Sequence, residues 1–390
     1  MSLRKRLCFS LLVTVLFFGG LEMDLRLHDF AFYYNFNADL LGLPLLDLSR
    51  LRRVANPTVT FDPRVFWRFK PNQLLSDPEV YRRPVLLNNL GFRGAGFTPQ
   101  KPAGVFRIAC LGDSATFGWS VGEDETYPHE LEGFLQERHP GRRFQVLNLG
   151  VTGYTSLQGR ELFLGEAAAF APDLVLFAFG PNDRLPALQS DAEHLFAGTW
   201  KISPVQVFLS RFQVYKLLRA GVIYLERRRQ GLSLDPRTIL PRLQRKVSQE
   251  DFAENAAAVK RRAVELGAGF ILLNVDFPSL PMDHNYSNLQ QEAAKVGVQL
   301  SPAWSQWDSP QKAAAIARDQ EVPELDLREL FRHELSRRRA EGEKLPDPDW
   351  FALMIDNGHP NAEGHRLIAQ ALAPLVEATP QFQRYLEATP

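Results

Sequence analysis

The chain has 390 residues, of which 45% are hydrophobic and 23% are charged, so the sequence predicts a packed core and excludes disorder throughout. Lysine plus arginine and aspartate plus glutamate each number 45, which gives a formal net charge of +0. Nucleic acid is therefore not expected as a partner, because phosphate binding depends on a basic field. The two cysteines, Cys8 and Cys110, are too few for a disulfide framework or a Cys-x-x-Cys metal site.

The first predicted element is a short apolar segment at the N-terminus. Arg4, Lys5 and Arg6 precede an uncharged run over residues 7–21, a pattern that is typical of a secretory signal peptide. The run is slightly shorter than the roughly twenty residues that a membrane-spanning helix needs. We expect residues 1–21 to be a signal peptide or a membrane anchor, and the protein to be exported or membrane-anchored, facing the periplasm or the extracellular side. Whether the segment is cleaved stays open, and the alternative is a buried helix in a cytosolic protein.

Residues 22–101 form the second predicted segment. Their many aromatic residues and prolines follow no regular spacing, so the pattern indicates an N-terminal extension that packs on the main domain. Within this extension, the sequence Gly91-Phe92-Arg93-Gly94 predicts a turn.

Residues 102–390 are predicted to form one α/β domain. Short runs that are apolar at nearly every position are typical of parallel strands buried on both faces. The predicted strands cover residues 106–111, 144–149, 174–179, 270–275 and, more weakly, 323–327. Helical patterns lie between them, around residues 131–135 and 252–263, and a last helix begins near Asn361. Strands that alternate with helices predict a doubly wound, mostly parallel sheet of about five strands.

An insertion at about residues 185–246 interrupts this alternation. Apolar residues recur in it at helical spacing and precede three arginines, so the pattern predicts an amphipathic helix that ends in positive charge. These residues are Phe208, Phe212, Tyr215, Leu218, Val222 and Leu225, followed by Arg227, Arg228 and Arg229. We expect this helix to pack its apolar stripe on the core. The alternatives are a lid over the site and a contact with a membrane surface.

Ser114 is the candidate nucleophile. It follows a predicted strand and the pair Gly112-Asp113, so its hydroxyl is expected at the carboxyl edge of the sheet, where open α/β folds bind ligands. The position also suits a residue that caps a helix, and the two roles are compatible. Acyl transfer by a serine further needs a base, a group that orients the base, and donors for the oxyanion.

The sequence Asp356-Asn357-Gly358-His359-Pro360 offers the base and its orienting group. Asn and Gly permit a tight bend, so the Asp356 carboxylate can fold toward Nδ1 of His359 and leave Nε2 to face a serine. Pro360 keeps His359 in a loop before the last helix. His365, which follows on that helix, is expected to be structural or exposed.

Two further blocks follow predicted strands at the same edge of the sheet. The block Asn148-Leu149-Gly150-Val151-Thr152-Gly153 carries glycines that let a backbone approach a ligand, and Gly180-Pro181-Asn182-Asp183 carries an amide donor. Either block alone is ordinary turn chemistry. Because all four blocks supply parts of one mechanism, together they predict an acyl-transfer site.

With these four blocks the sequence resembles the SGNH (GDSL-type) hydrolases over about residues 105–375. The resemblance implies a three-layer α/β/α flavodoxin-like sandwich that carries a catalytic triad. In that triad Ser114 is the nucleophile, His359 is the general base and then the acid, and Asp356 orients His359.

The resemblance also implies an oxyanion hole. Its donors are the backbone N–H groups of Ser114 and Gly153 and the side chain of Asn182, with Gly150 as the rival for the glycine position. No cofactor and no metal are expected. The extension and the insertion depart from shorter members of the family, and the insertion follows the Asn182 block directly, so it is expected to shape specificity.

The predicted function is a serine esterase that hydrolyses an O-acyl ester through an acyl-enzyme, with a short acyl group on an envelope saccharide or a lipid as substrate. The alternatives are an O-acyltransferase of envelope polysaccharide with the same triad, and a carbohydrate-binding protein without activity on the same fold. The expected partners are a small-molecule or saccharide ester and, through the N-terminal segment, a membrane. No Gly-x-Ser-x-Gly motif surrounds Ser114, so the α/β-hydrolase superfamily fits poorly.

Overall fold

The structure is a computed structural model of the whole chain. It describes residues 2–27, 58–62, 64–76, 82–187, 190–196, 204–209, 211–229, 237, 240–275, 291, 293–299, 315–318, 321–356 and 358–388. Parts of the predicted extension and of the predicted insertion lie outside these residues, as does Asn357.

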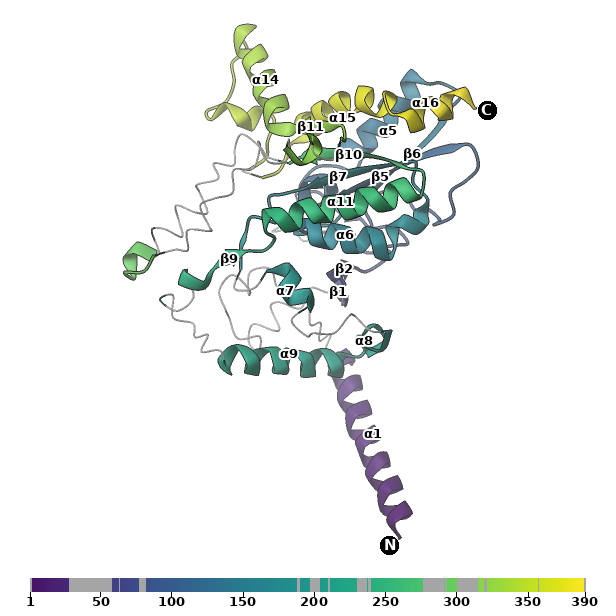
Figure 1. Cartoon of the computed structure of the whole chain (residues 1–390), viewed down its shortest axis with the longest axis vertical. Coiled ribbons are helices and arrows are strands. Elements are labelled where there is room, and N and C mark those ends of the chain that lie inside the picture. Colours follow the sequence, from purple (N-terminus) through teal and green to yellow (C-terminus); the bar gives the residue numbers. More distant parts are fainter. Residues whose placement is uncertain are drawn as a thin grey trace.

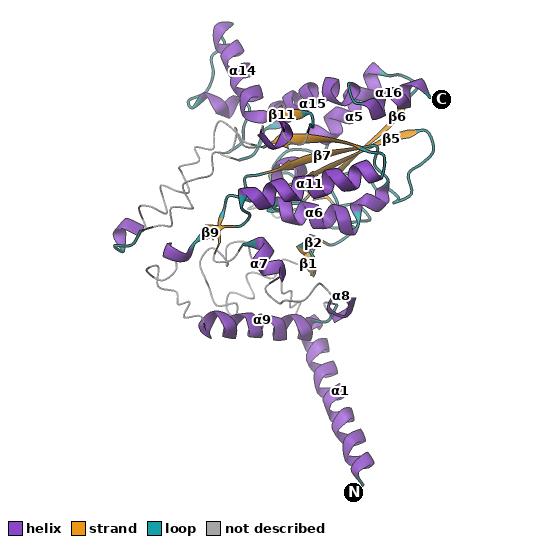
Figure 2. Cartoon of the chain, viewed as in Figure 1, coloured by secondary structure: helices purple, strands orange, loops and turns teal. Residues whose placement is uncertain are grey.

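A five-stranded parallel sheet forms the centre of the chain (Figure 1, Figure 2). Its strands are β5 (Val105–Gly112), β6 (Arg143–Gly150), β7 (Leu174–Phe179), β10 (Gly269–Asn274) and β11 (Glu324–Asp326). They lie in the order β11-β10-β7-β5-β6, and every neighbouring pair is parallel. The predicted mostly parallel sheet of about five strands is confirmed, and the predicted strand ends lie within two residues of the observed ones.

The strand order reverses once, next to β5. The chain passes from β5 to β6 on one side and then returns to the other side of β5 with β7. A reversal of this kind leaves a crevice at the carboxyl ends of the strands, where ligands bind in open α/β sheets. Ser114 follows β5 and Asn182 follows β7, so the strand order brings two predicted site residues to this crevice.

Helices cover both faces of the sheet and complete the three-layer α/β/α sandwich that the resemblance implies (Figure 1). One face carries α6 (Ser156–Gly165) and α11 (Gln249–Glu265), and the other carries α5 (Tyr127–Arg138), α14 (Leu327–Ala340), α15 (Ala362–Glu377) and α16 (Pro380–Glu387). Side chains alternate between these layers along each strand. In β5, Ala109 and Leu111 belong to the cluster under α6 and α11, whereas Ile108 and Cys110 belong to the cluster on the other face.

The C-terminal helices differ from the prediction in one respect. Asn361 caps α15, since its side chain accepts a hydrogen bond from the N–H of Gly364, so the predicted start near Asn361 agrees with the structure. The prediction that this helix is the last one is wrong. Thr379 caps a further amphipathic helix, α16, whose Phe382 is fully buried against the sheet. A break of only two residues between the two helices gave a weak signal in the sequence.

Several short elements surround the sandwich in the described ranges. Strands β1 (Val59–Asp62) and β2 (Phe66–Phe69) form one antiparallel pair, β3 (Leu74–Leu75) and β4 (Val85–Leu86) a second, and β8 (Pro186–Ala187) and β9 (Gln244–Arg245) a third. Among the residues that the structure describes, the short helices are α4 (Ser114–Phe117), α7 (Asp191–Phe196) and α8 (Pro204–Leu209), and 3₁₀ turns lie at Ala167–Phe170, Leu240–Arg242 and Asp349–Ala352.

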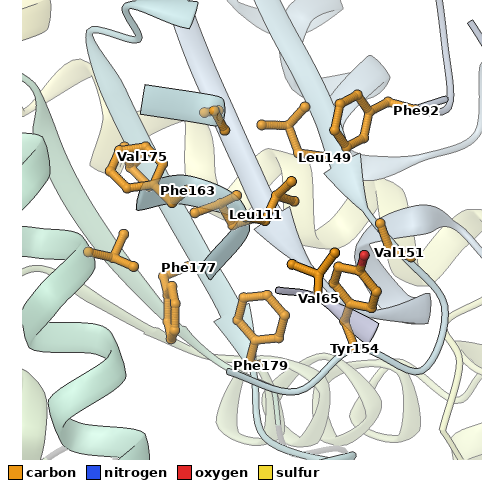
Figure 3. Packing of buried hydrophobic residues seen from close by; sticks show 14 of the residues in the cluster. Val65, Phe92, Leu111, Leu149, Val151, Tyr154, Phe163, Val175, Phe177 and Phe179 are labelled. Carbon is orange, nitrogen blue, oxygen red and sulfur yellow. The ribbon is translucent and has the colours of Figure 1, made fainter. Parts of the chain in front are cut away.

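The described part of the N-terminal extension shares its core with the sandwich. Figure 3 shows Val65 and Phe92 of the extension in one buried cluster with Leu111 and Leu149 of the sheet. Tyr154, which follows β6, donates its hydroxyl hydrogen bond to the backbone carbonyl of Trp67. The extension therefore contributes side chains to the layer of the core that lies under the candidate site.

Two long helices lie outside the sandwich. Helix α1 (Leu3–Leu27) has no buried residue. Its C-terminal end contacts α9 (Gln213–Arg229), which belongs to the insertion (Figure 1). The insertion does form an amphipathic helix, but the expectation that it packs its apolar stripe on the core is wrong. Leu218, Val222 and Leu225 are 58%, 62% and 63% exposed. The spacing of apolar residues predicts a face of a helix, but it does not predict what that face contacts.

Candidate active site

Ser114 lies at the first turn of α4, directly after β5. The side chain of Asp113 caps this helix by accepting a hydrogen bond from the N–H of Ala115 at 2.9 Å. Glycines at the ends of two strands let α4 pack against the sheet. A Cβ atom on Gly112 would overlap the side chain of Thr116, and one on Gly150 would overlap the backbone of Phe117. Helix α4, which carries the candidate nucleophile, is thus held by close contacts that only glycine permits.

His359 and Asp356 lie in a tight loop that is closed at both ends. An isolated antiparallel bridge joins Met354 to Pro360, and the N–H of Ile355 donates to the carbonyl of His359 at 2.8 Å. Inside the loop, Oδ1 of Asp356 accepts hydrogen bonds from the N–H groups of Gly358 at 2.8 Å and of His359 at 3.0 Å. These bonds turn the carboxylate back toward the imidazole, as the Asn-Gly bend in the sequence predicts.

The structure brings Ser114, His359 and Asp356 into one chain of hydrogen bonds. Nε2 of His359 lies 2.9 Å from Oγ of Ser114, and Nδ1 lies 2.8 Å from Oδ1 and 2.9 Å from Oδ2 of Asp356. Burial by itself would raise the pKa of Asp356, but the hydrogen bonds and charge of His359 lower it below its ordinary value. Asp356 is therefore an ionised acceptor at neutral pH. The side chain of Trp119 packs beside the imidazole, with ring centroids 5.8 Å apart.

The side chain of Asn182 bonds to residues of two other predicted blocks. Its Nδ2 donates to Oδ2 of Asp113 at 3.2 Å and to the carbonyl oxygen of Tyr154 at 3.0 Å. The amide therefore lies between the segment that carries Ser114 and the segment that carries Gly153. Both of its hydrogens have acceptors in the resting protein, and sequence reasoning did not foresee these acceptors.

Gly153 occupies a turn whose geometry requires glycine. The N–H of Tyr154 donates to the carbonyl of Val151 at 3.2 Å, and Gly153 has a φ of +80°, which side chains disfavour at this position of a turn. Within the described part of the chain, the N–H groups of Gly153 and Ser114 donate to no acceptor. The N–H of the rival residue, Gly150, donates to Oδ1 of Asn148 at 3.1 Å. The arrangement thus favours Gly153 over Gly150 as a donor to a ligand.

Two buried carboxyl groups lie behind the site. Burial raises the pKa of Asp113 to about 6 and that of Asp183 to about 7. Asp183 accepts hydrogen bonds from the N–H and the hydroxyl of Ser156, and the same hydroxyl accepts from Nδ2 of Asn255 at 3.0 Å. Asp183 thereby ties the loop after β7 to the start of α6. Asp183 is adjacent to Asn182 in the sequence, but its hydrogen-bond partner Ser156 lies 27 residues away, so the sequence did not indicate this contact.

Arg93 is a second contribution that sequence reasoning missed. Its buried guanidinium donates to the carbonyl oxygens of Phe117 at 2.9 Å, Gly118 at 2.5 Å and Val121 at 2.7 Å. These carbonyls end α4 and begin the loop that carries Trp119. The sequence predicted the turn at residues 91–94 but not the contacts of the Arg93 side chain. The one indication of these contacts was a charged residue within a segment rich in apolar residues.

His365 lies buried, which fits the structural alternative of its prediction and not the exposed one. Its Nδ1 accepts a hydrogen bond from the N–H of Tyr127 at 3.2 Å. Burial, with the nearby charge of Arg93, lowers the pKa of His365 to about 3. The residue is therefore a neutral packing element between α5 and α15.

Comparison with known proteins identifies the family. The model of the GDSL-like lipase/acylhydrolase family matches residues 110–367, which is more than half of the chain. The chain belongs to this family. Membership confirms the resemblance to GDSL-type hydrolases and the predicted class of enzyme, a hydrolase that acts on ester bonds. The match covers all four sequence blocks, from the strand before Ser114 to the helix after His359.

Individual relatives match more weakly. An acetylxylan esterase of Xylanibacter ruminicola is 33% identical over 96 residues, which cover 23% of this chain and 19% of that protein, so the match spans about a fifth of the relative. Among solved structures, an acetylxylan esterase of Geobacillus stearothermophilus has a TM-score of 0.40 at 16% identity and covers 70% of this chain and 95% of that chain. A GDSL-like lipase of Bacteroides thetaiotaomicron has a TM-score of 0.36 at 14% identity, covering 70% and 87%.

Proposed function

We propose that the protein is a serine esterase whose triad is Ser114, His359 and Asp356. The observation that carries the proposal is the chain of hydrogen bonds from Asp356 through His359 to Ser114, with each link between 2.8 and 2.9 Å. A neutral imidazole whose Nδ1–H is donated to a carboxylate leaves Nε2 as the acceptor of the serine proton.

The proposed reaction has two halves. Oγ of Ser114 attacks the ester carbonyl carbon while its proton passes to Nε2 of His359. The bond to the alcohol oxygen then breaks, and His359 returns the proton to that oxygen. Water attacks the acyl-enzyme in the same way, giving a proton to Nε2. The bond between the acyl carbon and Oγ breaks, the serine recovers its proton, and the carboxylic acid leaves.

The proposed oxyanion hole consists of the N–H groups of Ser114 and Gly153 and Nδ2 of Asn182. The two N–H groups support this role because they have no other acceptor among the described residues. The bond from Asn182 to Asp113, at 3.2 Å, is longer than the usual 2.9–3.0 Å of an N–H···O bond, so this hydrogen is the one that an oxyanion would attract. Donors of this kind stabilise the tetrahedral intermediate more than the ground state.

We further propose that the substrate is a short acyl ester, such as an O-acetyl group, on an envelope saccharide. Similarity to a protein described as an acetylxylan esterase supports the acyl group and the saccharide. For the chain as a whole, we propose an N-terminal segment at residues 1–21, an extension at 22–101 and a hydrolase domain at 102–390 with the insertion at about 185–246.

We propose that α1 is a retained membrane anchor and that the hydrolase domain faces the outside of the cytoplasmic membrane. The helix is continuous to Leu27, beyond the apolar run at residues 7–21, and its window of mean hydropathy 1.7 suits a bilayer. The basic residues Arg4, Lys5 and Arg6 lie at the end distant from the domain, which favours a cytoplasmic N-terminus.

The test is turnover of p-nitrophenyl acetate, butyrate and octanoate by the full chain and by its Ser114→Ala variant. We expect hydrolysis that falls about a thousandfold or more in the variant, with acetate as the preferred substrate. Ser336→Ala, at an exposed position of α14, is the matched control and should retain full activity. Equal turnover by the wild type and Ser114→Ala would overturn the proposed nucleophile. Acetyl transfer to an added xylo-oligosaccharide in place of water would identify the acyltransferase alternative.

A further inference from the structure

The α8–α9 segment presents an apolar face to solvent. Leu218, Val222 and Leu225 are spaced by four and three residues, so they lie on one face of α9, and each is more than half exposed. In α8, Val205 and Phe208 are 62% and 54% exposed. A helix of a soluble domain buries such a stripe, but no element of the described part of the chain covers this one.

The contact between α9 and α1 indicates what covers this face. Nη2 of Arg26 donates to the carbonyl of Arg211 at 2.8 Å, and the N–H of Val214 donates to Oε2 of Glu22 at 2.9 Å. The carboxylate of Glu22 thus caps the first turn of α9 and holds that turn against the C-terminal end of α1. Figure 1 shows α9 running across this end, while the rest of α1 points away from the sandwich.

The length of α1 then sets the position of α9 in a membrane. At about 1.5 Å per residue, a helix of 25 residues is roughly 37 Å long, slightly more than the roughly 30 Å hydrocarbon core of a bilayer. If α1 crosses a bilayer, its C-terminal end reaches the headgroup region. Because α9 begins at that end and runs across it (Figure 1), α9 lies at about the same depth.

We propose that α8 and α9 lie in the interface of the membrane that α1 crosses, with Leu218, Val222 and Leu225 among the upper acyl chains. The proposal rests on the membrane anchoring proposed above. Two exposed arginines, Arg229 at the end of α9 and Arg211 two residues before its start, suit the phosphates of anionic lipids. Two attachments hold the domain in one orientation, whereas α1 alone would leave it free to rotate.

The test measures how deeply one residue of α9 lies in a membrane. The full chain with Cys8→Ser is placed in vesicles of phosphatidylethanolamine and phosphatidylglycerol, and an environment-sensitive fluorophore is attached at Val222→Cys. Cys110 remains, because it is buried and burial raises the pKa of its thiol, which makes it unreactive. The matched control carries the label at Val264→Cys on α11, since Val264 is 60% exposed and Val222 is 62% exposed.

Flotation of the vesicles first establishes that the protein is bound to them. We expect iodide to quench the label at residue 222 about threefold less than the label at residue 264, and lipids that carry a nitroxide to quench only the former. Bound protein in which both labels are equally accessible to iodide overturns the docking of α9 and leaves the anchor intact. Protein that does not float overturns both, whereas hydrolysis of p-nitrophenyl acetate by the same samples reports on the esterase proposal alone.

Discussion

Asp356 and Asn182 of the candidate site each make hydrogen bonds beyond those that the proposed reaction requires. Asp356 accepts from the imidazole of His359 and also from two backbone N–H groups of its own loop, so the carboxylate cannot rotate away from the histidine. Asn182 donates both hydrogens of its amide before any substrate is bound. The two residues are therefore oriented in advance, so the proposed reaction would not have to order them.

Asn182→Ala tests the oxyanion role at this scale. We expect kcat for p-nitrophenyl acetate to fall about a hundredfold, because loss of one oxyanion donor costs on the order of that factor. The variant should stay folded, with circular dichroism like that of the wild type. Asn274→Ala is the control, since it removes another buried asparagine, whose Nδ2 donates to Oδ2 of Asp326 at 3.2 Å and which has no contact with the proposed machinery in the described part of the chain. A similar loss of kcat in both variants would point to general disturbance of the fold.

Asp183 predicts a pH dependence of stability. A carboxyl group with a pKa of about 7 in the folded chain and about 4 in the unfolded chain binds its proton more tightly when folded. Its contribution to stability is therefore complete below about pH 4 and is lost as the pH rises through 7. In Asp183→Asn this loss disappears, so we expect the melting temperature of the wild type to fall relative to that of the variant between pH 5 and pH 8.

Comparing the wild type with Asp183→Asn removes the contribution of His365, whose dependence on pH has the opposite sign. The pKa of His365 is lowered to about 3, so its contribution is present above about pH 6.5 and is lost as the pH falls. That contribution is common to both proteins and cancels in the difference between them. The charges of Asp191 and Asp113 help to raise the pKa of Asp183, so the difference reports the titration of Asp183 together with these two acidic neighbours. A difference in melting temperature that stays constant from pH 5 to pH 8 would contradict the raised pKa of Asp183.

At the scale of elements, the position of α4 depends on the ends of two strands. Gly112 and Gly150 are paired in the register of β5 and β6, and both permit the close approach of α4. A side chain at either residue would push α4 outward and carry Ser114 away from His359. The sheet therefore positions Ser114 through the absence of two side chains.

Gly150→Ala and Gly133→Ala should have opposite effects on stability. We expect Gly150→Ala to lower the free energy of unfolding by about 2 kcal/mol or more and to reduce kcat, because the new methyl group would overlap the backbone of Phe117. Gly133 lies inside α5 with open space around it, so alanine there should raise the free energy of unfolding by about 0.5–1 kcal/mol. Urea unfolding followed by fluorescence measures both, and equal stability of the two variants would contradict the packing argument.

At the scale of the whole molecule, the extension and the sandwich meet at the candidate site. Arg93 reaches from the extension to three carbonyls at the end of α4, and Val65 and Phe92 complete the core beneath it. The positive charge lies at the carboxyl end of a helix, which is the favourable end for a cation. Through this contact, the extension acts on the segment that holds Ser114 and Trp119.

Arg93→Lys tests this link. A lysine cannot reproduce the fork that contacts Phe117, Gly118 and Val121 together, so we expect the free energy of unfolding to fall by about 2–4 kcal/mol, with a lower kcat. Arg83→Lys is the matched control in the same extension. The side chain of Arg83 is 58% exposed in its ion pair with Glu125, and lysine keeps the charge, so this substitution should cost less than about 1 kcal/mol. Equal stability of the two variants in urea would show that the three carbonyl contacts of Arg93 contribute nothing.

The amino-acid sequence alone determined the strands, their alternation with helices, the start of α15 and the family. These features follow from local patterns: runs of buried apolar residues, a capping asparagine before α15 and four short motifs in one order. It also predicted Ser114, Asp356 and His359 as parts of one site, and these three residues do lie within hydrogen-bond distance of one another. Their catalytic roles stay a proposal.

Only the tertiary structure decided which surfaces meet. The spacing of Leu218, Val222 and Leu225 predicts one apolar face of a helix, whether that face is buried or exposed. In the fold this face is exposed, and the helix begins next to the end of α1. Likewise, the contacts of Arg93 with residues 117–121 and of Asp183 with Ser156 join segments that are 24 to 28 residues apart. A local pattern states which side of an element is apolar or polar, but the partner of that side depends on the packing of the whole chain.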